Sequence, residues 1–179
     1  MRVLISGGPG SGCTSTALMV GDRLNIPVFD SDTYFHKPSD PPFQEQYTPE
    51  ERRELLNRAL AGHSSWILSG SVATWGLIDL RPTHAVFLQI PTVERLDRLK
   101  RRQRARFGPR IDPGGDMEEE HNSFMAWAAE YENRTGRGRN LAADLAFLES
   151  SGGIFVRYAE IEPLEEVVER VFGFVSIPR

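Results

Sequence analysis

The feature that most constrains the fold of this chain is the segment SGGPGSGCTST, which spans residues 6–16. Residues 3–5 before it are apolar and rich in β-branched side chains, as is typical of a short buried strand. Residues 14–24 after it have the pattern of a helix. Glycines allow the backbone to turn sharply between the two elements. The chain therefore begins with a strand, a tight loop and a helix, which is the first unit of a parallel α/β sheet.

The loop between these elements has the spacing Gly7-x-x-x-x-Gly12-x-Thr14, which is typical of a phosphate-binding loop. In such a loop successive backbone N–H groups point at an anion, and the following helix adds its free N–H groups and the positive end of its dipole. The Thr14 hydroxyl is then a candidate ligand of Mg²⁺. We call residues 7–15 the glycine loop. Its candidate nucleotide-binding residues are Gly7, Gly8, Pro9, Gly10, Ser11, Gly12, Cys13, Thr14 and Ser15. The alternative is a glycine-rich turn that binds no ligand.

Cys13 stands where the usual pattern has lysine. The backbone N–H groups can still bind phosphate after this change, but a cation beside the β- and γ-phosphates is lost. That charge matters most in the transition state of phosphoryl transfer. A thiol cannot replace it, and a helix start can lower the pKa of a cysteine and add negative charge.

The rest of the chain alternates apolar strand-like runs with helical patterns, which predicts one α/β domain over residues 1–179. Further strands are expected at residues 25–30, 64–71, 83–90 and 152–161. Helices are expected at 48–62, 92–107, 117–132, 140–149 and 164–172. Two segments rich in Pro, Gly and charge are predicted to project from the domain, at about 31–50 on the substrate side and about 104–116 as a lid.

Composition limits the kinds of function. The chain has 179 residues, a net charge of −4 and one cysteine, and its pI is near 5.6. This charge argues against a general nucleic-acid binder. No apolar run approaches the roughly 20 residues that span a bilayer, and no Cys-based disulfide is possible within the chain. A cytoplasmic protein without a membrane or nucleic-acid partner is expected; the oligomeric state is left open.

The sequence GGPGSGCTST resembles the loop of the small P-loop kinases, the adenylate-kinase-like and shikimate-kinase-like enzymes, which commonly read GGPGSGK. The resemblance extends along nearly the whole chain and departs most clearly at Cys13. It implies a three-layer P-loop NTPase fold with a five-stranded parallel sheet in the order 2-3-1-4-5. It also implies an arginine-rich lid after the helix that follows strand four, and an adenine position near residues 158–162.

Asp30 and Asp32 follow the second predicted strand, at the sheet edge where ligands of open α/β folds bind. The two carboxylates are candidates to hold Mg²⁺, with Asp32 beside Thr14, or to accept the proton of an attacking hydroxyl. The matching D-x-D of shikimate-kinase-like enzymes serves the metal and the substrate hydroxyl. The alternative is that either aspartate only caps the next turn. The DGFPR-like and STGD-like stretches of adenylate-type kinases are absent, so the sequence does not support AMP as acceptor.

Residues 95–110 contain eight basic side chains and a single acidic one, Asp97. Most would face solvent on a helix, but the segment resembles the kinase lid, where guanidinium groups bind phosphates. The candidates are Arg102, Arg106 and Arg110, followed by Arg137 and Arg139. A lid arginine or Lys37 is the candidate to supply the charge that is missing at position 13.

These residues support three hypotheses. The first is an ATP-dependent phosphotransferase that uses Mg²⁺ and acts on a hydroxylated metabolite, nucleoside or nucleotide. The second is a nucleotide-binding switch or pseudokinase with weak or no turnover. The third is a structural protein that binds an anion without turnover.

Overall fold

The computed structural model describes residues 1–40, 42–76 and 80–177. A five-stranded, all-parallel sheet lies at its centre. The strands are β1 (Arg2–Gly7), β2 (Val28–Asp30), β3 (Trp66–Ser69), β4 (His84–Leu88) and β5 (Ile154–Tyr158). Their order across the sheet is β2-β3-β1-β4-β5. The order implied by the resemblance is therefore confirmed.

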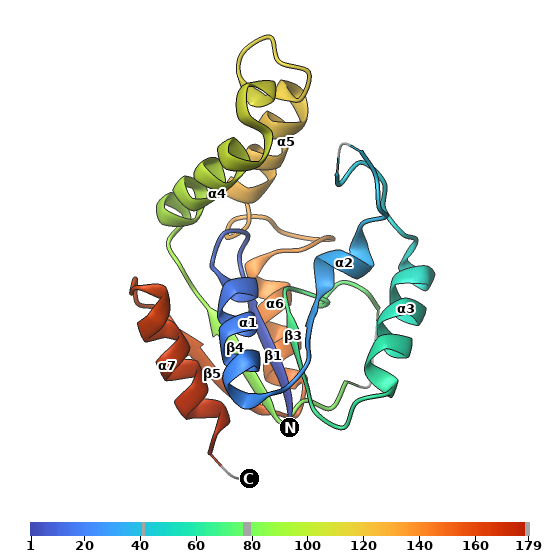
Figure 1. Cartoon of the computed structure of the whole chain (residues 1–179), viewed down its shortest axis with the longest axis vertical. Coiled ribbons are helices and arrows are strands. Elements are labelled where there is room, and N and C mark those ends of the chain that lie inside the picture. Colours follow the sequence, from blue (N-terminus) through green and yellow to red (C-terminus); the bar gives the residue numbers. More distant parts are fainter. Residues whose placement is uncertain (41, 77–79, 178–179) are drawn as a thin grey trace.

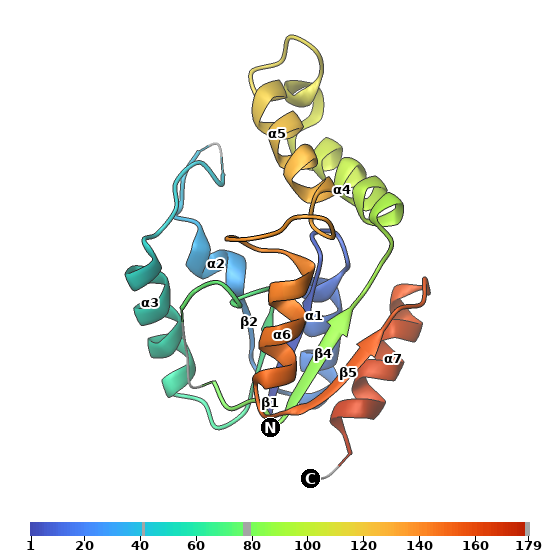
Figure 2. The same ribbon diagram turned by 180° about the vertical axis from the view of Figure 1, so that it is seen from behind.

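Helices cover both faces of the sheet, as Figures 1 and 2 show from opposite sides. They are α1 (Cys13–Leu24), α2 (Ser31–Phe35), α3 (Pro49–Ala61), α4 (Thr92–Phe107), the 3₁₀ helix η1 (Gly108–Ile111), α5 (Glu118–Ala129), α6 (Leu141–Ser150) and α7 (Leu164–Val175). Helices α1 and α7 pack together on one face, and α6 lies on the other. The predicted three-layer α/β fold is confirmed.

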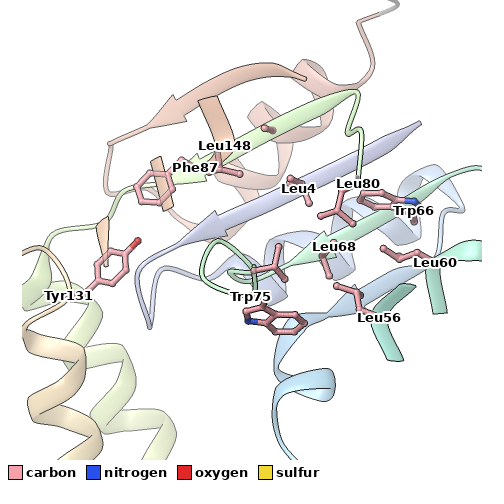
Figure 3. Packing of buried hydrophobic residues seen from close by; sticks show 12 residues of the cluster. Leu4, Leu56, Leu60, Trp66, Leu68, Trp75, Leu80, Phe87, Tyr131 and Leu148 are labelled. Carbon is pink, nitrogen blue, oxygen red and sulfur yellow. The ribbon is translucent and has the colours of Figure 1, made fainter. Parts of the chain in front are cut away.

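The two faces of the central strand β1 belong to two separate hydrophobic clusters. Leu4 packs in one cluster with side chains of α3 and α6, including Leu56 and Leu148 (Figure 3). Val3 and Ile5 point to the other face and pack with α1 and α7. A strand of a parallel sheet that is covered on both faces has to be apolar at every position, which explains why residues 3–5 read as a continuous apolar run.

Local sequence signals explain where several helices begin. The side chain of Thr48 accepts a hydrogen bond from the N–H of Glu51, whose carboxylate accepts one from the N–H of Thr48, and Pro49 occupies the first turn of α3. This reciprocal pair is a capping box. Asn140 caps α6 through the N–H of Ala143. The short helix η1 was not predicted, because it lies in a segment whose Pro, Gly and charge content favoured a loop. The short helix α2 was not predicted either, because its cap is the side chain of Asp30, for which the sequence left a capping and a ligand-binding role open.

Two segments extend beyond the carboxyl ends of the strands (Figure 1). One is the α4–α5 hairpin, residues 92–129, which carries the predicted lid segment 104–116 at its tip. The other runs from α2 to the start of α3 and contains an antiparallel bridge between His36 and Gln46. Residue 41 of this predicted 31–50 excursion lies outside the described residues. Whether either segment closes over a ligand stays a prediction.

Among the residues that the structure describes, no helix combines the length and apolar character needed to cross a membrane.

Candidate functional site

A cavity of about 620 Å³ lies at the carboxyl edge of the sheet, where the two projecting segments meet the glycine loop. All nine residues of the glycine loop line it, together with side chains that follow β2 and β3 and others from the α4–α5 hairpin. The remaining lining residues are Asp30, Ser31, Asp32, Phe35, His36, Gln46, Arg52, Gly70, Ser71, Thr74, Trp75, Arg102, Phe124, Trp127, Gly138 and Arg139. The position is the one expected for a ligand site in an open α/β sheet.

The backbone of the glycine loop has a conformation that is compatible with anion binding. Gly10 and Gly12 have φ angles of 87° and 93°, a region that favours glycine. Gly12 occupies the N-cap of α1 and provides no side-chain hydrogen bond to the first turn, so the N–H groups of that turn remain available to an anion. A Cβ on Gly10 would come within 2.5 Å of the carbonyl oxygen of Arg95. The residues present therefore fit a bound phosphate chain.

The thiol of Cys13 is buried and neutral. Its Sγ lies 3.1 Å from Oγ of Ser11, and its side chain belongs to the hydrophobic cluster beneath α1. Burial raises the pKa of the Cys13 thiol to about 11, although the hydrogen bond with Ser11 and the charge of Arg139 act in the other direction. The expectation that the pKa of Cys13 is lowered was therefore wrong, because burial outweighs the effects of Ser11 and Arg139. The loop lacks a cation at position 13, but it gains no anion.

Thr14 and the two aspartates lie close together in the wall of the cavity. The Thr14 hydroxyl donates to Oδ2 of Asp30 at 2.9 Å, and Oδ1 of Asp30 accepts from the N–H of Asp32 at 2.9 Å and so caps α2. Asp30 thus has both the capping role and the contact with the loop. Burial raises the pKa of Asp30; the N–H of Asp32 lowers it, and the nearby Asp32 carboxylate raises it further. The carboxylate beside Thr14 is that of Asp30, and the side chain of Asp32 is exposed to the cavity.

The predicted lid arginines do not all reach the site. Arg102 lines the cavity. Its pKa is lowered by burial and by Arg106, while Asp32 and Asp30 act in the opposite direction. Arg106 and Arg110 are not among the lining residues: Arg106 lies 4.9 Å from the ring of Phe43, and Arg110 forms an exposed ion pair with Asp116 at 2.7 Å.

Of the other predicted cations, Arg139 lines the cavity, and Lys37 and Arg137 do not. Lys37 also lies outside the set of lining residues, and its ammonium group is 5.5 Å from the ring of Tyr47. Arg137 is exposed, whereas Arg139 lines the cavity. Of the cations proposed to replace the missing lysine, Arg102 and Arg139 are the two that reach the cavity in the part of the chain described here.

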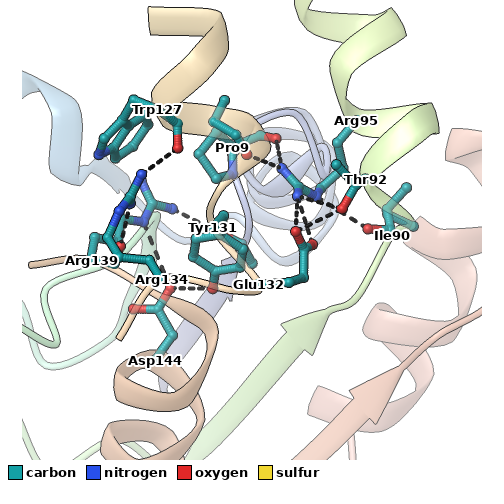
Figure 4. A network of polar contacts seen from close by, with 12 residues as sticks. Pro9, Ile90, Thr92, Arg95, Trp127, Tyr131, Glu132, Arg134, Arg139 and Asp144 are labelled. Carbon is teal, nitrogen blue, oxygen red and sulfur yellow. Dashed lines mark hydrogen bonds and ion pairs between the residues drawn. The ribbon is translucent and has the colours of Figure 1, made fainter. Parts of the chain in front are cut away.

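Sequence reasoning missed the role of Arg95, whose residue is fully buried. Its guanidinium donates to the carbonyl oxygen of Pro9 at 2.8 Å and to that of Ile90 at 3.2 Å. Its Nη2 lies 2.6 Å from both carboxylate oxygens of Glu132 (Figure 4). The glycine loop is thereby connected to the base of the α4–α5 hairpin. In the sequence Arg95 is indistinguishable from its solvent-facing neighbours, because only the folded chain brings Glu132 to it.

A second buried group lies beside the loop. Asp144 accepts hydrogen bonds from Ser71 at 2.5 Å and from Tyr131 at 2.6 Å. Nε of Arg139 lies 3.6 Å from Oδ2 of the same carboxylate. The ring of Tyr131 lies so close to Gly8 that a Cβ there would approach it to 2.9 Å. No sequence signal pointed to Asp144, which reads as an ordinary polar residue of a helix.

A smaller cavity of about 80 Å³ adjoins the glycine loop on its other side. It is lined by Gly12 and Thr16, and by Tyr158, Glu160 and Glu162 after β5. Arg170 forms ion pairs with Glu160 at 3.0 Å and Glu162 at 2.6 Å. This is the segment at which the resemblance implied the adenine position. Within the described ranges, no group of three or more His, Cys, Asp or Glu side chains is arranged to hold a metal ion.

Comparison with known proteins gives a family and a fold. The chain is 30% identical over 180 residues to the uncharacterized protein YqaC of Bacillus subtilis (strain 168), and the match covers 98% of this chain and 97% of YqaC. The chain belongs to the family of YqaC. No model of a protein family matches it.

Two solved structures are similar along almost the whole chain. Shikimate kinase from Bacteroides thetaiotaomicron has a TM-score of 0.53 and 19% identity, and the match covers 99% of each chain. A gluconokinase from Sinorhizobium meliloti 1021 has a TM-score of 0.54 and 16% identity, with 96% of this chain and 89% of that chain covered. At these identities the similarity shows the fold alone: the chain shares the fold of these two enzymes.

Proposed function

We propose that the protein is an ATP-dependent phosphotransferase that moves the γ-phosphoryl group of ATP to a hydroxyl group of a small molecule. The observation that carries this proposal is the junction of the glycine loop with the two aspartates: the Thr14 hydroxyl lies 2.9 Å from Asp30, in the same cavity as Asp32. The proposal is supported by the position of the glycine loop and these carboxylates in the wall of one cavity, since in-line phosphoryl transfer needs a phosphate site and a proton acceptor close together.

The donor set beside the loop fits Mg²⁺. Thr14 and Asp30 offer a hydroxyl and a carboxylate oxygen, the ligand types that this cation prefers alongside phosphates. When bound, Mg²⁺ neutralises charge on the phosphate oxygens. We assign the metal side to Thr14 and Asp30, and the acceptor side to Asp32, whose side chain is exposed to the cavity.

In the proposed reaction the acceptor oxygen forms a bond to the γ-phosphorus while the bond from that phosphorus to the β–γ bridging oxygen breaks. ADP is the leaving group, and the proton of the acceptor hydroxyl passes to the carboxylate of Asp32. The cavity wall beyond the aspartates combines Phe35 and Trp75 with the polar groups of Thr74 and Arg52. Such a mixed wall suits a compact hydroxylated metabolite.

The test is ADP release from MgATP with a panel of polyols, sugar acids and nucleosides. The wild type should release ADP with at least one acceptor, and Asp32→Asn should lower kcat by about 100-fold or more. Asp22→Asn, an exposed change on α1, is the matched control and should leave the rate unchanged. Absence of acceptor-dependent ADP release across the panel contradicts the proposal.

The specific observation that favours a second function is the buried, neutral Cys13 in place of a lysine. A loop that binds nucleotide without an efficient transition-state cation is suited to a nucleotide-binding switch or pseudokinase. Saturable MgATP binding without turnover on any acceptor would favour this function. Absence of nucleotide binding would leave only a structural anion-binding role.

A further inference from the structure

We propose that Arg139 supplies the positive charge that the glycine loop lacks at position 13, and that its guanidinium binds the β- and γ-phosphates of the nucleotide. This inference rests on the proposed nucleotide-binding function. From the sequence, Arg139 is a phosphate-binding candidate that ranks after Arg102, Arg106 and Arg110, and a lid arginine or Lys37 is the candidate for the missing charge. The structure brings Arg139 to the loop from the segment before α6.

Arg139 is in direct contact with the glycine loop. Its Nη2 donates to the carbonyl oxygen of Gly7 at 2.7 Å, and its charge is close enough to Cys13 to affect the pKa of the thiol. The side chain is 23% exposed and lines the large cavity together with every residue of the loop. The guanidinium therefore lies beside the glycine loop, although Arg139 is far from Cys13 in the sequence.

The hydrogen-bonding capacity of this guanidinium is largely unused. It carries five N–H donors. In the described part of the structure Nη2 bonds to Gly7, while Nε is buried without a hydrogen-bond partner and lies 3.6 Å from Asp144. Both oxygens of Asp144 already accept shorter bonds from Ser71 and Tyr131. Asp144 thus holds the guanidinium in place electrostatically and leaves donors for a phosphate.

The backbone around Arg139 is also fixed. Asn140 caps α6, and its side-chain amide donates to the carbonyl oxygens of Gly136 and Gly138 at 3.3 and 3.0 Å. The carbonyl oxygen of Arg139 accepts a hydrogen bond from Arg134 at 2.8 Å (Figure 4). A cation that is positioned before the ligand arrives loses little conformational entropy on binding.

The other two arginines that line the large cavity in the described part of the chain are less suited to this role. The guanidinium of Arg52 lies 3.6 Å from the ring centroid of Phe35 and donates to Oε1 of Gln46 at 3.1 Å. Arg102 interacts electrostatically with Asp32 and Asp30, on the side of the cavity that we assign to the metal and the acceptor. Arg98 is the nearest side chain to Gly12, with its Nη1 3.9 Å from a Cβ built there, but its Nε is paired with Glu94 at 2.8 Å and it lines the smaller cavity. Among the described arginines that line the large cavity, Arg139 is the one that donates a hydrogen bond to the glycine loop.

The experiment compares the binding of MgATP and of AMP by calorimetry, without any acceptor. Because a charge-assisted hydrogen bond contributes more than a neutral one, Arg139→Met should weaken MgATP binding by about 10- to 100-fold. The affinity for AMP, which has no β- or γ-phosphate, should change by less than about 3-fold. Arg137→Met removes an exposed arginine two positions away and should bind both nucleotides as the wild type does.

A second pair of variants separates charge from structure even if Arg139→Met does not fold. Arg139→Lys keeps the positive charge, whereas Arg139→Gln keeps hydrogen-bond donors without the charge. The Arg139→Lys protein should therefore bind MgATP at least about 5-fold more tightly than the Arg139→Gln protein. Equal affinities of these two variants would overturn the inference, as would an equal loss of MgATP and AMP binding in Arg139→Met. A wild type that binds no MgATP would instead refute the proposed function, and this inference with it.

Discussion

Arg95→Met tests the connection between the glycine loop and the α4–α5 hairpin. The wild-type guanidinium is fully buried and bonded to the carbonyl oxygens of Pro9 and Ile90 and to the carboxylate of Glu132. Methionine fills much of the same volume but donates no hydrogen bond, so the substitution removes these polar contacts without a large cavity.

The expected loss of unfolding free energy in Arg95→Met depends on the carboxylate of Glu132, which loses its partner. Breaking a buried ion pair by removing one partner costs about 3–5 kcal/mol. The side chain of Glu132 is 26% exposed and keeps the hydrogen bond from the hydroxyl of Thr92 at 2.7 Å. Water and Thr92 therefore offset part of the loss, and we expect the lower end, about 3 kcal/mol. For a domain of this size the corresponding fall in Tm is about 6–12 °C.

Thermal unfolding followed by circular dichroism measures this change. The control is Arg101→Met on the same helix, where the side chains of Arg101 and Asp97 are 69% and 57% exposed; its effect should stay below about 1 kcal/mol. A second substitution, Glu132→Leu in the Arg95→Met background, removes the unpaired charge and should recover part of the stability. The reasoning is refuted if Arg95→Met lowers Tm no more than Arg101→Met.

Three further changes test the loop and its neighbours. Gly10→Ala places a side chain at a φ of 87° against the carbonyl oxygen of Arg95. It should lower the free energy of unfolding, measured in urea, by about 2 kcal/mol or more and weaken MgATP binding. The control Gly62→Ala, with no atom within 4 Å of its Cβ, should change neither quantity. Asp30→Asn should lower turnover but leave Tm at pH 7 unchanged or higher. Because the pKa of Asp30 is raised in the folded state, its contribution to stability is full below its unfolded pKa and is lost as pH rises through its folded pKa. If the wild type instead gained stability over the variant with rising pH, the raised pKa of Asp30 would be contradicted. Cys13, with a pKa of about 11, should react with a disulfide reagent at pH 8 about 100-fold more slowly in the native than in the unfolded chain, and equal rates would show that the native thiol is accessible and ionised.

Much of the fold is readable from local sequence. The apolar run at residues 3–5, the glycines that follow it and the cap at Thr48 each act over a few positions, and the elements that they predict are confirmed. The strand order depends on contacts between distant segments, and it came from the resemblance to P-loop kinases rather than from the residues themselves. The short helix α2 was missed because its cap is the side chain of Asp30, whose role in the sequence was ambiguous.

The candidate site was predictable only where one segment supplies it. The glycine loop and the aspartates after β2 are each contiguous, and the structure brings them to one cavity. The sequence offers no basis for ranking the arginines by burial, because a run of like charges gives no sign of which side chain is buried. Arg95 is buried because α5 brings Glu132 to it, and Arg139 reaches the loop because the segment before α6 passes beside Gly7.

The central claim is that the glycine loop binds a nucleoside triphosphate although Cys13 replaces the lysine. Calorimetric titration of the wild type with MgATP, repeated in the presence of inorganic tripolyphosphate as a competitor, tests it most directly. We predict saturable binding at one site with a dissociation constant below about 1 mM, equivalent to about 4 kcal/mol, and displacement by tripolyphosphate. An absence of binding heat and of any protection against thermal unfolding at about 10 mM MgATP, well above that constant, would contradict the account.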